Sequence, residues 1–402
     1  MKHISLGIVA FLLVVFNWSC DELGETGEAG LTERTDAYAL SAGMESGSGD
    51  SGGDGTGGNG EYQAGVITAG EWNDLENWDF WIDLQQNDEF SRALSEWEFS
   101  PFDRYSFHVQ FQDQSPAADV EIRLKKGESI LWQCRTDNRG KAECWADLWD
   151  AGINTDGISY QVLLEGQMLQ TGDAAPYSQG VNVVNLNRSP ATRDDVDVMF
   201  VVDATGSMGD ELEFLKVELN DVLEKAEAEN MALTMRYGAV FYRDQDDAYL
   251  TRAHGFNEDV GQLIDFIRDQ TANGGGDYPE AVEVALAEAV YQHAWSEEAR
   301  SRILFLMLDA PPHHETEIVR ELHEIVESAT EKGIRIIPIS ASGIDRNTEF
   351  LLRFFATSTN GTYTFITDVS GIGNDHLEPT TGNYEDEKLN DLLLRLINAF
   401  CE

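Results

Sequence analysis

The chain has 402 residues, 42% of them hydrophobic, and is therefore long enough for two or three domains with sizeable cores. Its 27 Lys and Arg residues are outnumbered by 73 Asp and Glu residues, which gives a formal net charge of −46. A nucleic-acid partner needs a basic face, so this composition argues against one and favours a soluble, self-repelling surface.

The first 20 residues have the features of a targeting segment. Lys2 and His3 precede an apolar run over 4–16, which is too short to span a bilayer but fits a signal-peptide core. A small residue then precedes Cys20, as in the lipobox of bacterial lipoproteins, although Asn17 stands where Leu is usual. We expect lipidated Cys20 to begin the mature chain and to anchor it in a membrane. Ordinary cleavage near that point is the alternative.

Residues 21–61 are polar and small, and Gly and Ser dominate the end of this stretch. Such a composition is typical of a flexible spacer, which would lift a folded body off a membrane. Asp21 and Glu22 resemble the acidic signal of surface lipoproteins in some Gram-negative groups. We therefore expect a lipid-anchored protein of the bacterial cell envelope, at the outer membrane or the cell surface.

Residues 62–190 form a β-rich region. Alternating runs bounded by glycines predict strands over 105–111, 119–125, 129–136 and 141–148. The pattern from Val120 to Ala142 resembles the transthyretin-like or carboxypeptidase-regulatory β-sandwich of many surface proteins. Seven of the nine tryptophans fall between Trp72 and Trp149. We expect them to fill the core of this domain, in preference to stacking on carbohydrate.

The cysteines of this region flank a hairpin turn signal over 137–140. Cys134 and Cys144 are equidistant from Arg139, which places them opposite each other on two strands. We predict that they form a disulfide bond, which export would permit. Cys401 is then left without a partner.

Strand-like and helical runs alternate over 195–402, a pattern typical of a doubly wound α/β domain. Strands are predicted over 196–202, 233–242, 303–308, 334–340 and 362–366. Helices are predicted over 210–229, 260–270, 279–293, 315–332, 348–357 and 387–400. In such a sheet, ligands bind beyond the carboxyl ends of the strands.

Oxygen-bearing side chains gather at that edge. Asp203, Thr205 and Ser207 follow the first strand of the domain, and Asp309 ends the strand over 303–308. The Gly-rich loop from Gly274 adds a further acid, Asp277. Carboxylate and hydroxyl oxygens are ligands for a hard cation such as Mg²⁺. The simpler alternative is that Asp203 and Ser207 only cap the following helix.

Residues 195–402 thus resemble a von Willebrand factor A (VWA) domain with a metal-ion-dependent adhesion site. Asp203, Thr205 and Ser207 match the Asp-x-Ser-x-Ser motif of the family, Asp277 stands at its loop threonine, and Asp309 matches its later Asp. The resemblance implies a non-enzymatic module that binds Mg²⁺, Mn²⁺ or Ca²⁺. An acidic residue of an extracellular or envelope protein would complete the coordination of the cation.

The sequence departs from the family pattern at two positions. Asp277 replaces the usual threonine, and Ala310 follows Asp309 where glycine is common. With three aspartates the cation would not neutralise the site, so Asp277 acts through water or the cation is mainly structural. Arg243, which follows the strand over 233–242, either clamps a partner carboxylate or pairs with one of the aspartates.

Other functions fit the sequence less well. His313 and His314 are adjacent and would point apart, so we do not predict zinc. A metal-dependent phosphatase of the haloacid dehalogenase type would need a second Asp where Thr205 stands. We therefore expect a binding protein that acts in adhesion or envelope assembly. A structural envelope scaffold is the main alternative, and a hydrolase is the lesser one.

Overall fold

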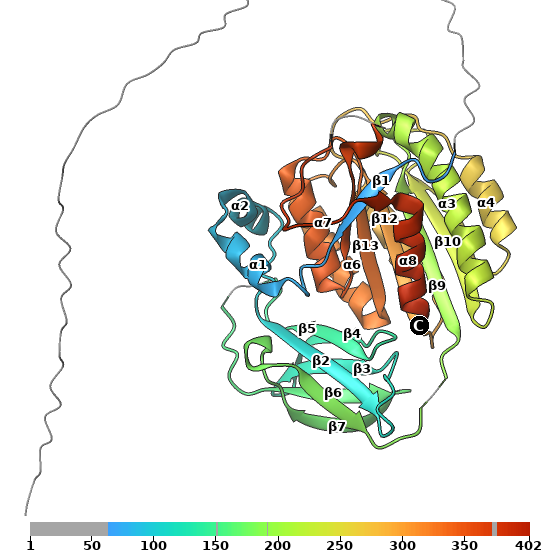
Figure 1. The fold of residues 1–402 in the computed structure, drawn as a ribbon. Coiled ribbons are helices and arrows are strands. Elements are labelled where there is room, and N and C mark those ends of the chain that lie inside the picture. Colours follow the sequence, from blue (N-terminus) through green and yellow to red (C-terminus); the bar gives the residue numbers. More distant parts are fainter. Residues whose placement is uncertain (1–62, 150–151, 191, 372–375) are drawn as a thin grey trace, which may run out of the picture. The chain divides into compact units, whose positions relative to one another are not determined.

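A computed structural model of the chain describes residues 63–149, 152–190, 192–371 and 376–402 (Figure 1). Cys20 and the predicted spacer over 21–61 lie outside the described residues. In the described part of the chain, no helix has both the length and the apolar character needed to cross a bilayer.

One eight-stranded sheet forms the centre of the α/β domain, with strand order β11-β10-β9-β12-β13-β14-β1-β15. Seven of these strands lie within residues 195–402, and the eighth is β1 (Thr68–Trp72). The five strands from β10 to β14 in this order are parallel, and β11, β1 and β15 are antiparallel to their neighbours. The strands are β9 (Asp195–Asp203), β10 (Thr234–Tyr242), β11 (Thr251–Asn257), β12 (Ser301–Leu308), β13 (Ile334–Ser340), β14 (Tyr363–Ile366) and β15 (Glu387–Lys388). The predicted doubly wound α/β fold is confirmed, because helices follow these strands on both faces.

Alternate residues of the buried strands contact different helices, which is why the strands are apolar throughout. Val198 and Phe200 pack in one cluster with α3 (Gly209–Glu229), α4 (Val260–Arg268) and α8 (Leu389–Cys401). Met199 and Val201 pack in the other cluster with α5 (Val282–Ala287), α6 (Thr316–Lys332) and α7 (Arg346–Ser358). The carboxyl edge of the sheet between these two layers carries the loops that contain the predicted site.

Two smaller sheets form the predicted β domain. One has the order β5-β2-β8, and the other has the order β4-β3-β6-β7. Their strands are β2 (Arg104–Phe111), β3 (Glu121–Lys126), β4 (Ser129–Arg135), β5 (Lys141–Trp145), β6 (Ile158–Leu164), β7 (Gln167–Asp173) and β8 (Asn182–Leu186). Cys134 and Cys144 lie in different sheets, with their sulfur atoms 3.2 Å apart, and both are free thiols. The predicted pair is therefore adjacent, but in this structure it is not bonded.

The start of the described chain belongs to the large sheet, although we assigned it to the β-rich region. Strand β1 (Thr68–Trp72) pairs with β14 and β15. Just before it, the buried carboxylate of Glu218 on α3 accepts hydrogen bonds from the amides of Gly65, Val66 and Ile67 at 2.8–3.3 Å. The β domain is thus inserted between β1 and β9 of the α/β domain.

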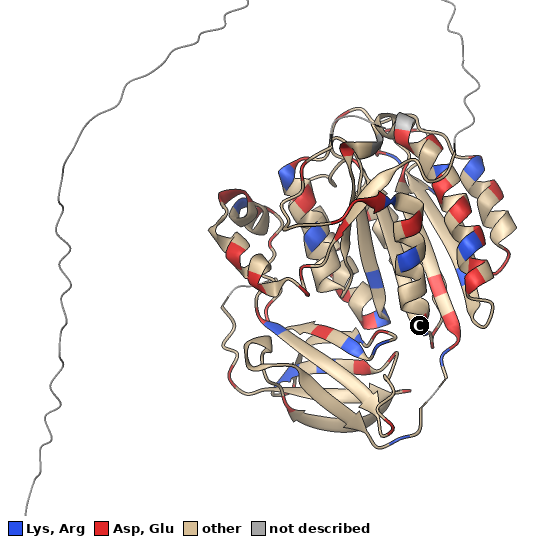
Figure 2. Cartoon of the chain, viewed as in Figure 1, with Lys and Arg blue, Asp and Glu red and all other residues tan. Residues whose placement is uncertain are grey.

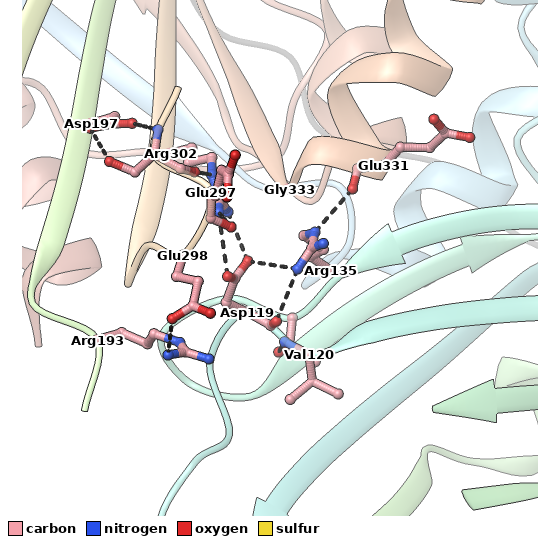
Figure 3. Close-up of polar contacts among 12 residues, drawn as sticks. Asp119, Val120, Arg135, Arg193, Asp197, Glu297, Glu298, Arg302, Glu331 and Gly333 are labelled. Carbon is pink, nitrogen blue, oxygen red and sulfur yellow. Dashed lines mark hydrogen bonds and ion pairs between the residues drawn. The ribbon is translucent and has the colours of Figure 1, made fainter. Parts of the chain in front are cut away.

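Two short helices and a network of buried charges connect the inserted domain to the α/β domain. Helices α1 (Trp78–Asp83) and α2 (Asp88–Glu96) bring Trp81 and Phe90 against Phe354 of α7. Asp119, which precedes β3, accepts hydrogen bonds from Arg302 of β12 at 2.8 and 3.3 Å and from Arg135 at 3.3 Å (Figure 3). The predicted core role of the tryptophans also holds, since five of them are at most 8% exposed: Trp72, Trp81, Trp97, Trp132 and Trp145.

Candidate metal site

The loop after β9 gathers the first three predicted side chains. Asp203 and Thr205 are fully buried, and Asp203 Oδ1 accepts hydrogen bonds from Thr205 N at 2.8 Å and Thr205 Oγ1 at 2.7 Å. Ser207 is exposed, and its Oγ lies 3.2 Å from Thr205 Oγ1. The residue that caps α3 is Met208, and no side chain accepts a capping hydrogen bond there. The alternative that Asp203 and Ser207 serve only as helix caps is therefore wrong.

Asp309 joins this loop from the neighbouring strand β12. It follows directly after Leu308 and is 5% exposed. Burial raises the pKa of Asp309 to about 6; the hydroxyl of Ser207 opposes this rise, and the charge of Glu211 adds to it. Glu211 lies in the first turn of α3 and is 1% exposed. Asp309 thus faces both the Ser207 hydroxyl and a second buried acid.

The Gly-rich loop contributes Glu280 to the site. Gly275 has φ of +69°, and a Cβ atom there would lie 2.8 Å from Glu280 Oε1 and 3.3 Å from Thr205 Cβ. Glu280 is 2% exposed, and its backbone N donates a hydrogen bond to the carbonyl of Pro311 at 2.9 Å. This contact delays the predicted helix over 279–293, which begins only at Val282 and turns π-helical over 288–292.

Asp277 and Arg243 have different places from those expected. Asp277 is exposed, whereas Glu280 is the acid of this loop that is buried beside Thr205. Arg243 is only 6% exposed and donates to the carbonyls of Ala204 at 3.1 Å and Thr271 at 2.6 Å. Neither expected role of Arg243 matches these contacts, because its guanidinium connects the loops that carry Ala204 and Thr271.

Three buried carboxylates, on Asp203, Asp309 and Glu280, therefore interact electrostatically at this edge. Burial, followed by the charge of Asp309, raises the pKa of Asp203 to about 7. Burial and the surrounding aspartates raise the pKa of Glu280 to about 9. Asp203 Oδ2, Asp309 Oδ1 and Glu280 Oε2 are buried and have no hydrogen-bond partner of normal length and angle. The buried Tyr242 hydroxyl interacts with Asp203 and only partly offsets the rise in its pKa. Unpaired buried carboxylate oxygens are costly, so this arrangement favours a bound proton or cation.

The neighbouring polar residues support the loops. Asp247 Oδ2 accepts hydrogen bonds from Gly275 N at 2.9 Å and Asp244 N at 3.1 Å. Asp244 Oδ1 lies 2.8 Å from His313 Nε2. His314 points elsewhere, with its Nε2 2.7 Å from the carbonyl of Glu96. The two adjacent histidines thus have separate partners.

The donor set determines which cation would fit. Within the described residues, no three His, Cys, Asp or Glu side chains are grouped as metal ligands. The site instead combines carboxylates with the hydroxyls of Thr205 and Ser207, and only oxygen donors are present. Such a set suits Mg²⁺ or another hard divalent cation and is unsuited to zinc. The sequence did not single out Glu280; its place beside Pro279 suggested a helix start.

Comparisons with known proteins agree with this fold. Residues 197–373 match the family model of the von Willebrand factor A domain. A putative ariadne-like RING finger protein of Acanthamoeba polyphaga mimivirus is 34% identical over 140 residues, which is 33% of this chain and 13% of that protein. The alpha-protein kinase vwkA of Dictyostelium discoideum is 28% identical over 119 residues, which is 29% of this chain and 19% of that protein. The chain therefore spans a small fraction of these relatives.

Solved structures are similar to about half of the chain. BatB, a conserved hypothetical protein of Bacteroides thetaiotaomicron, is 14% identical with a TM-score of 0.36. An aerotolerance-related membrane protein of Bacteroides fragilis is 14% identical with a TM-score of 0.34. Each comparison covers 51% of this chain and 98% of the solved chain.

Proposed function

Because residues 197–373 match a von Willebrand factor A domain, we propose that the chain is a protein-binding module that holds a divalent cation. Mg²⁺ is the first choice, with Mn²⁺ or Ca²⁺ as substitutes. The observation that carries the proposal is the set of three buried carboxylate oxygens without partners, on Asp203, Asp309 and Glu280. The ligands would come from these carboxylates and from the hydroxyls of Thr205 and Ser207. A cation there would offset the repulsion between the acids and leave the Ser207 side open to a partner.

The proposed module is not an enzyme. A phosphatase of the haloacid dehalogenase type would need an acid or base two residues after its nucleophilic Asp, and Thr205 at that position donates a hydrogen bond to Asp203. A structural envelope scaffold remains the second candidate, since a cation among buried acids would also stabilise the fold. Cation-dependent retention of a partner separates the two, because a scaffold would keep its stability gain without retaining a partner.

We further propose that lipidated Cys20 anchors the protein in the bacterial cell envelope, at the outer membrane or cell surface. The signal-peptide pattern and the acidic residues after Cys20 support this location. Expression of the full chain and of Cys20→Ser, followed by membrane fractionation, tests the anchor. The variant should appear in the soluble fraction, and its continued retention in the membrane would contradict lipid anchoring.

Thermal unfolding of the full chain tests the metal site. The wild type is titrated with Mg²⁺, Mn²⁺ or Ca²⁺ after removal of metal by EDTA, and Tm is expected to rise with cation concentration. Asp203→Asn and Glu280→Gln should abolish or strongly reduce this rise. Glu315→Gln removes an exposed charge near the same edge and should retain it. If the wild-type Tm does not respond to any of the three cations, the proposed metal site is wrong.

A further inference from the structure

Arginines gather where the inserted β domain meets the α/β domain, although the chain as a whole is strongly acidic. Acidic residues, drawn in red, outnumber basic residues, drawn in blue, across the described chain (Figure 2). Arg302 and Arg335 are the second residues of the neighbouring strands β12 and β13, and Arg135 ends β4. The carboxylates that act on these arginines belong to Asp119 and Asp137. Three guanidinium groups thus face two carboxylates, which leaves one positive charge uncompensated.

Arg335 is the arginine of this group that lacks a carboxylate of its own. It is 2% exposed, and among the described residues it donates only to the carbonyls of Gly333 at 2.8 Å and Arg135 at 3.3 Å. Asp119 is already shared by two other arginines (Figure 3), and Asp137 accepts from two backbone amides at 2.8 and 2.9 Å. Burial lowers the pKa of Arg335, and the charge of Asp137 only partly opposes this effect. A buried charge without a bonded counter-ion is strongly destabilising.

A small cavity lies beside the guanidinium group of Arg335. Its volume is about 10 Å³, and residues of both domains line it, among them Cys134, Arg135, Glu143, Gly333, Arg335 and Ser358. Two polar atoms of these residues, Arg335 Nε and Ser358 Oγ, are buried and have no hydrogen-bond partner within the described part of the chain. Ser358 is only 1% exposed. The cavity therefore has one charged and one neutral donor that a bound group could satisfy.

The size and the charge of the cavity determine which occupant fits. The volume of about 10 Å³ is close to the space that one water molecule needs, so sulfate, phosphate and organic acids are too large. A water molecule would satisfy both donors but leave the charge of Arg335 uncompensated. Chloride is only slightly larger than water, accepts hydrogen bonds and supplies the missing negative charge. The acid that lines the cavity, Glu143, does not oppose an anion, because Arg104 binds its carboxylate at 2.8 and 3.0 Å.

We propose that this cavity binds a chloride ion, which accepts hydrogen bonds from Arg335 Nε and Ser358 Oγ and neutralises the buried guanidinium group. The ion would strengthen the joint between the domains. Arg335 also binds the carbonyl of Arg135 on β4, and Trp145 Nε1 of β5 donates to the carbonyl of Ser358 at 3.3 Å. The site lies at the amino end of β13, opposite the edge that carries the metal site, and it does not depend on the proposed function.

Thermal unfolding of the full chain in EDTA tests the proposal. Sodium gluconate is replaced stepwise by sodium chloride or sodium bromide at a constant ionic strength of about 0.15 M. Tm should rise with either halide and reach a plateau, because an ion that binds only the folded chain stabilises it. EDTA removes divalent cations from every sample, so failure of this test and failure of the metal site are separate results. A wild-type Tm that does not respond to halide would overturn the proposal.

Two neighbouring variants separate the cavity from a general effect of salt. Ser358→Ala should raise the half-saturating chloride concentration by about tenfold, which corresponds to the loss of one hydrogen bond to an ion. Thr357→Val removes another buried hydroxyl without a partner in the described chain, but Thr357 does not line the cavity. This control should keep the wild-type response. Equal responses of Ser358→Ala and the wild type would overturn the proposal.

Crystals of the full chain soaked in sodium bromide locate the ion directly, because bromide scatters X-rays anomalously. One anomalous peak is expected within hydrogen-bonding distance of Arg335 Nε and Ser358 Oγ. Density without an anomalous signal at that position would identify a buried water only, and the proposal would then be wrong.

Discussion

Replacement of Asp203 by asparagine should stabilise the metal-free protein at alkaline pH, although it removes a ligand. Asp203 is fully buried, and its pKa is raised from 3.8 to about 7, chiefly by burial and then by Asp309. Such a rise corresponds to a penalty of up to about 4 kcal/mol once the folded carboxylate is ionised. Asparagine keeps an Oδ1 acceptor for the two hydrogen bonds from Thr205 but carries no charge. We expect a gain of about 2 to 4 kcal/mol in the free energy of unfolding.

The pH dependence of this gain has a definite sign. Well below pH 3.8, Asp203 is protonated in both folded and unfolded chains, so wild type and variant have similar stability. As the pH rises towards 7, the unfolded carboxyl ionises while the folded one keeps its proton, and the wild type loses stability. Above pH 7 the folded carboxylate is ionised as well, and the difference between variant and wild type is complete.

Urea unfolding followed by tryptophan fluorescence measures the effect at pH 5 and pH 8, with EDTA or Mg²⁺. In EDTA, Asp203→Asn should exceed the wild type at pH 8, and the gain should be smaller at pH 5. Mg²⁺ at about a hundred times its Kd should add about 3 kcal/mol to the wild type at pH 8 and almost nothing to the variant. Glu315→Gln should behave as wild type. A variant that is less stable than wild type at pH 8 in EDTA would refute the argument from buried charge.

Three further outcomes follow from the structure. Glu280→Gln should weaken Mg²⁺ binding, measured by calorimetry, by at least about tenfold. Asp277→Asn should change the Kd for Mg²⁺ by less than about threefold. A larger loss in Asp277→Asn than in Glu280→Gln would show that the exposed acid is the ligand. Protein exported into an oxidising compartment should lose the thiols of Cys134 and Cys144 to a disulfide and be lighter than the reduced chain by about 2 Da, the mass of two hydrogens. Three titratable thiols in denaturant, with Cys401 as the third, would rule out the disulfide. Asp119→Asn leaves the buried guanidinium of Arg302 without its carboxylate and should lower the free energy of unfolding by about 3 to 5 kcal/mol. An unchanged urea midpoint would show that the network contributes little.

The sequence determined the α/β domain and most of its strands because the signals are local. Apolar runs such as 303–308 are buried on both faces, and the helices carry apolar residues at helical spacing. The motif from Asp203 to Ser207 identified the site for the same reason, since its three side chains are neighbours along the chain. The strand over 68–72 was missed because its pairing partner lies almost three hundred residues away.

Only the tertiary structure decided which acid of the Gly-rich loop enters the site and what Arg243 does. Asp277 and Glu280 are both acids within two residues of Pro279. Their spacing along the chain does not show which of them enters the metal site. The backbone contact of Glu280 with Pro311 and the close approach at Gly275 bury Glu280 and leave Asp277 in solvent. Arg243 likewise meets carbonyls that two separate loops bring together. Periodicity depends on residues that are close in the sequence, so it can be recognised before folding. Burial and charge pairing depend on contacts that exist only after the chain has folded.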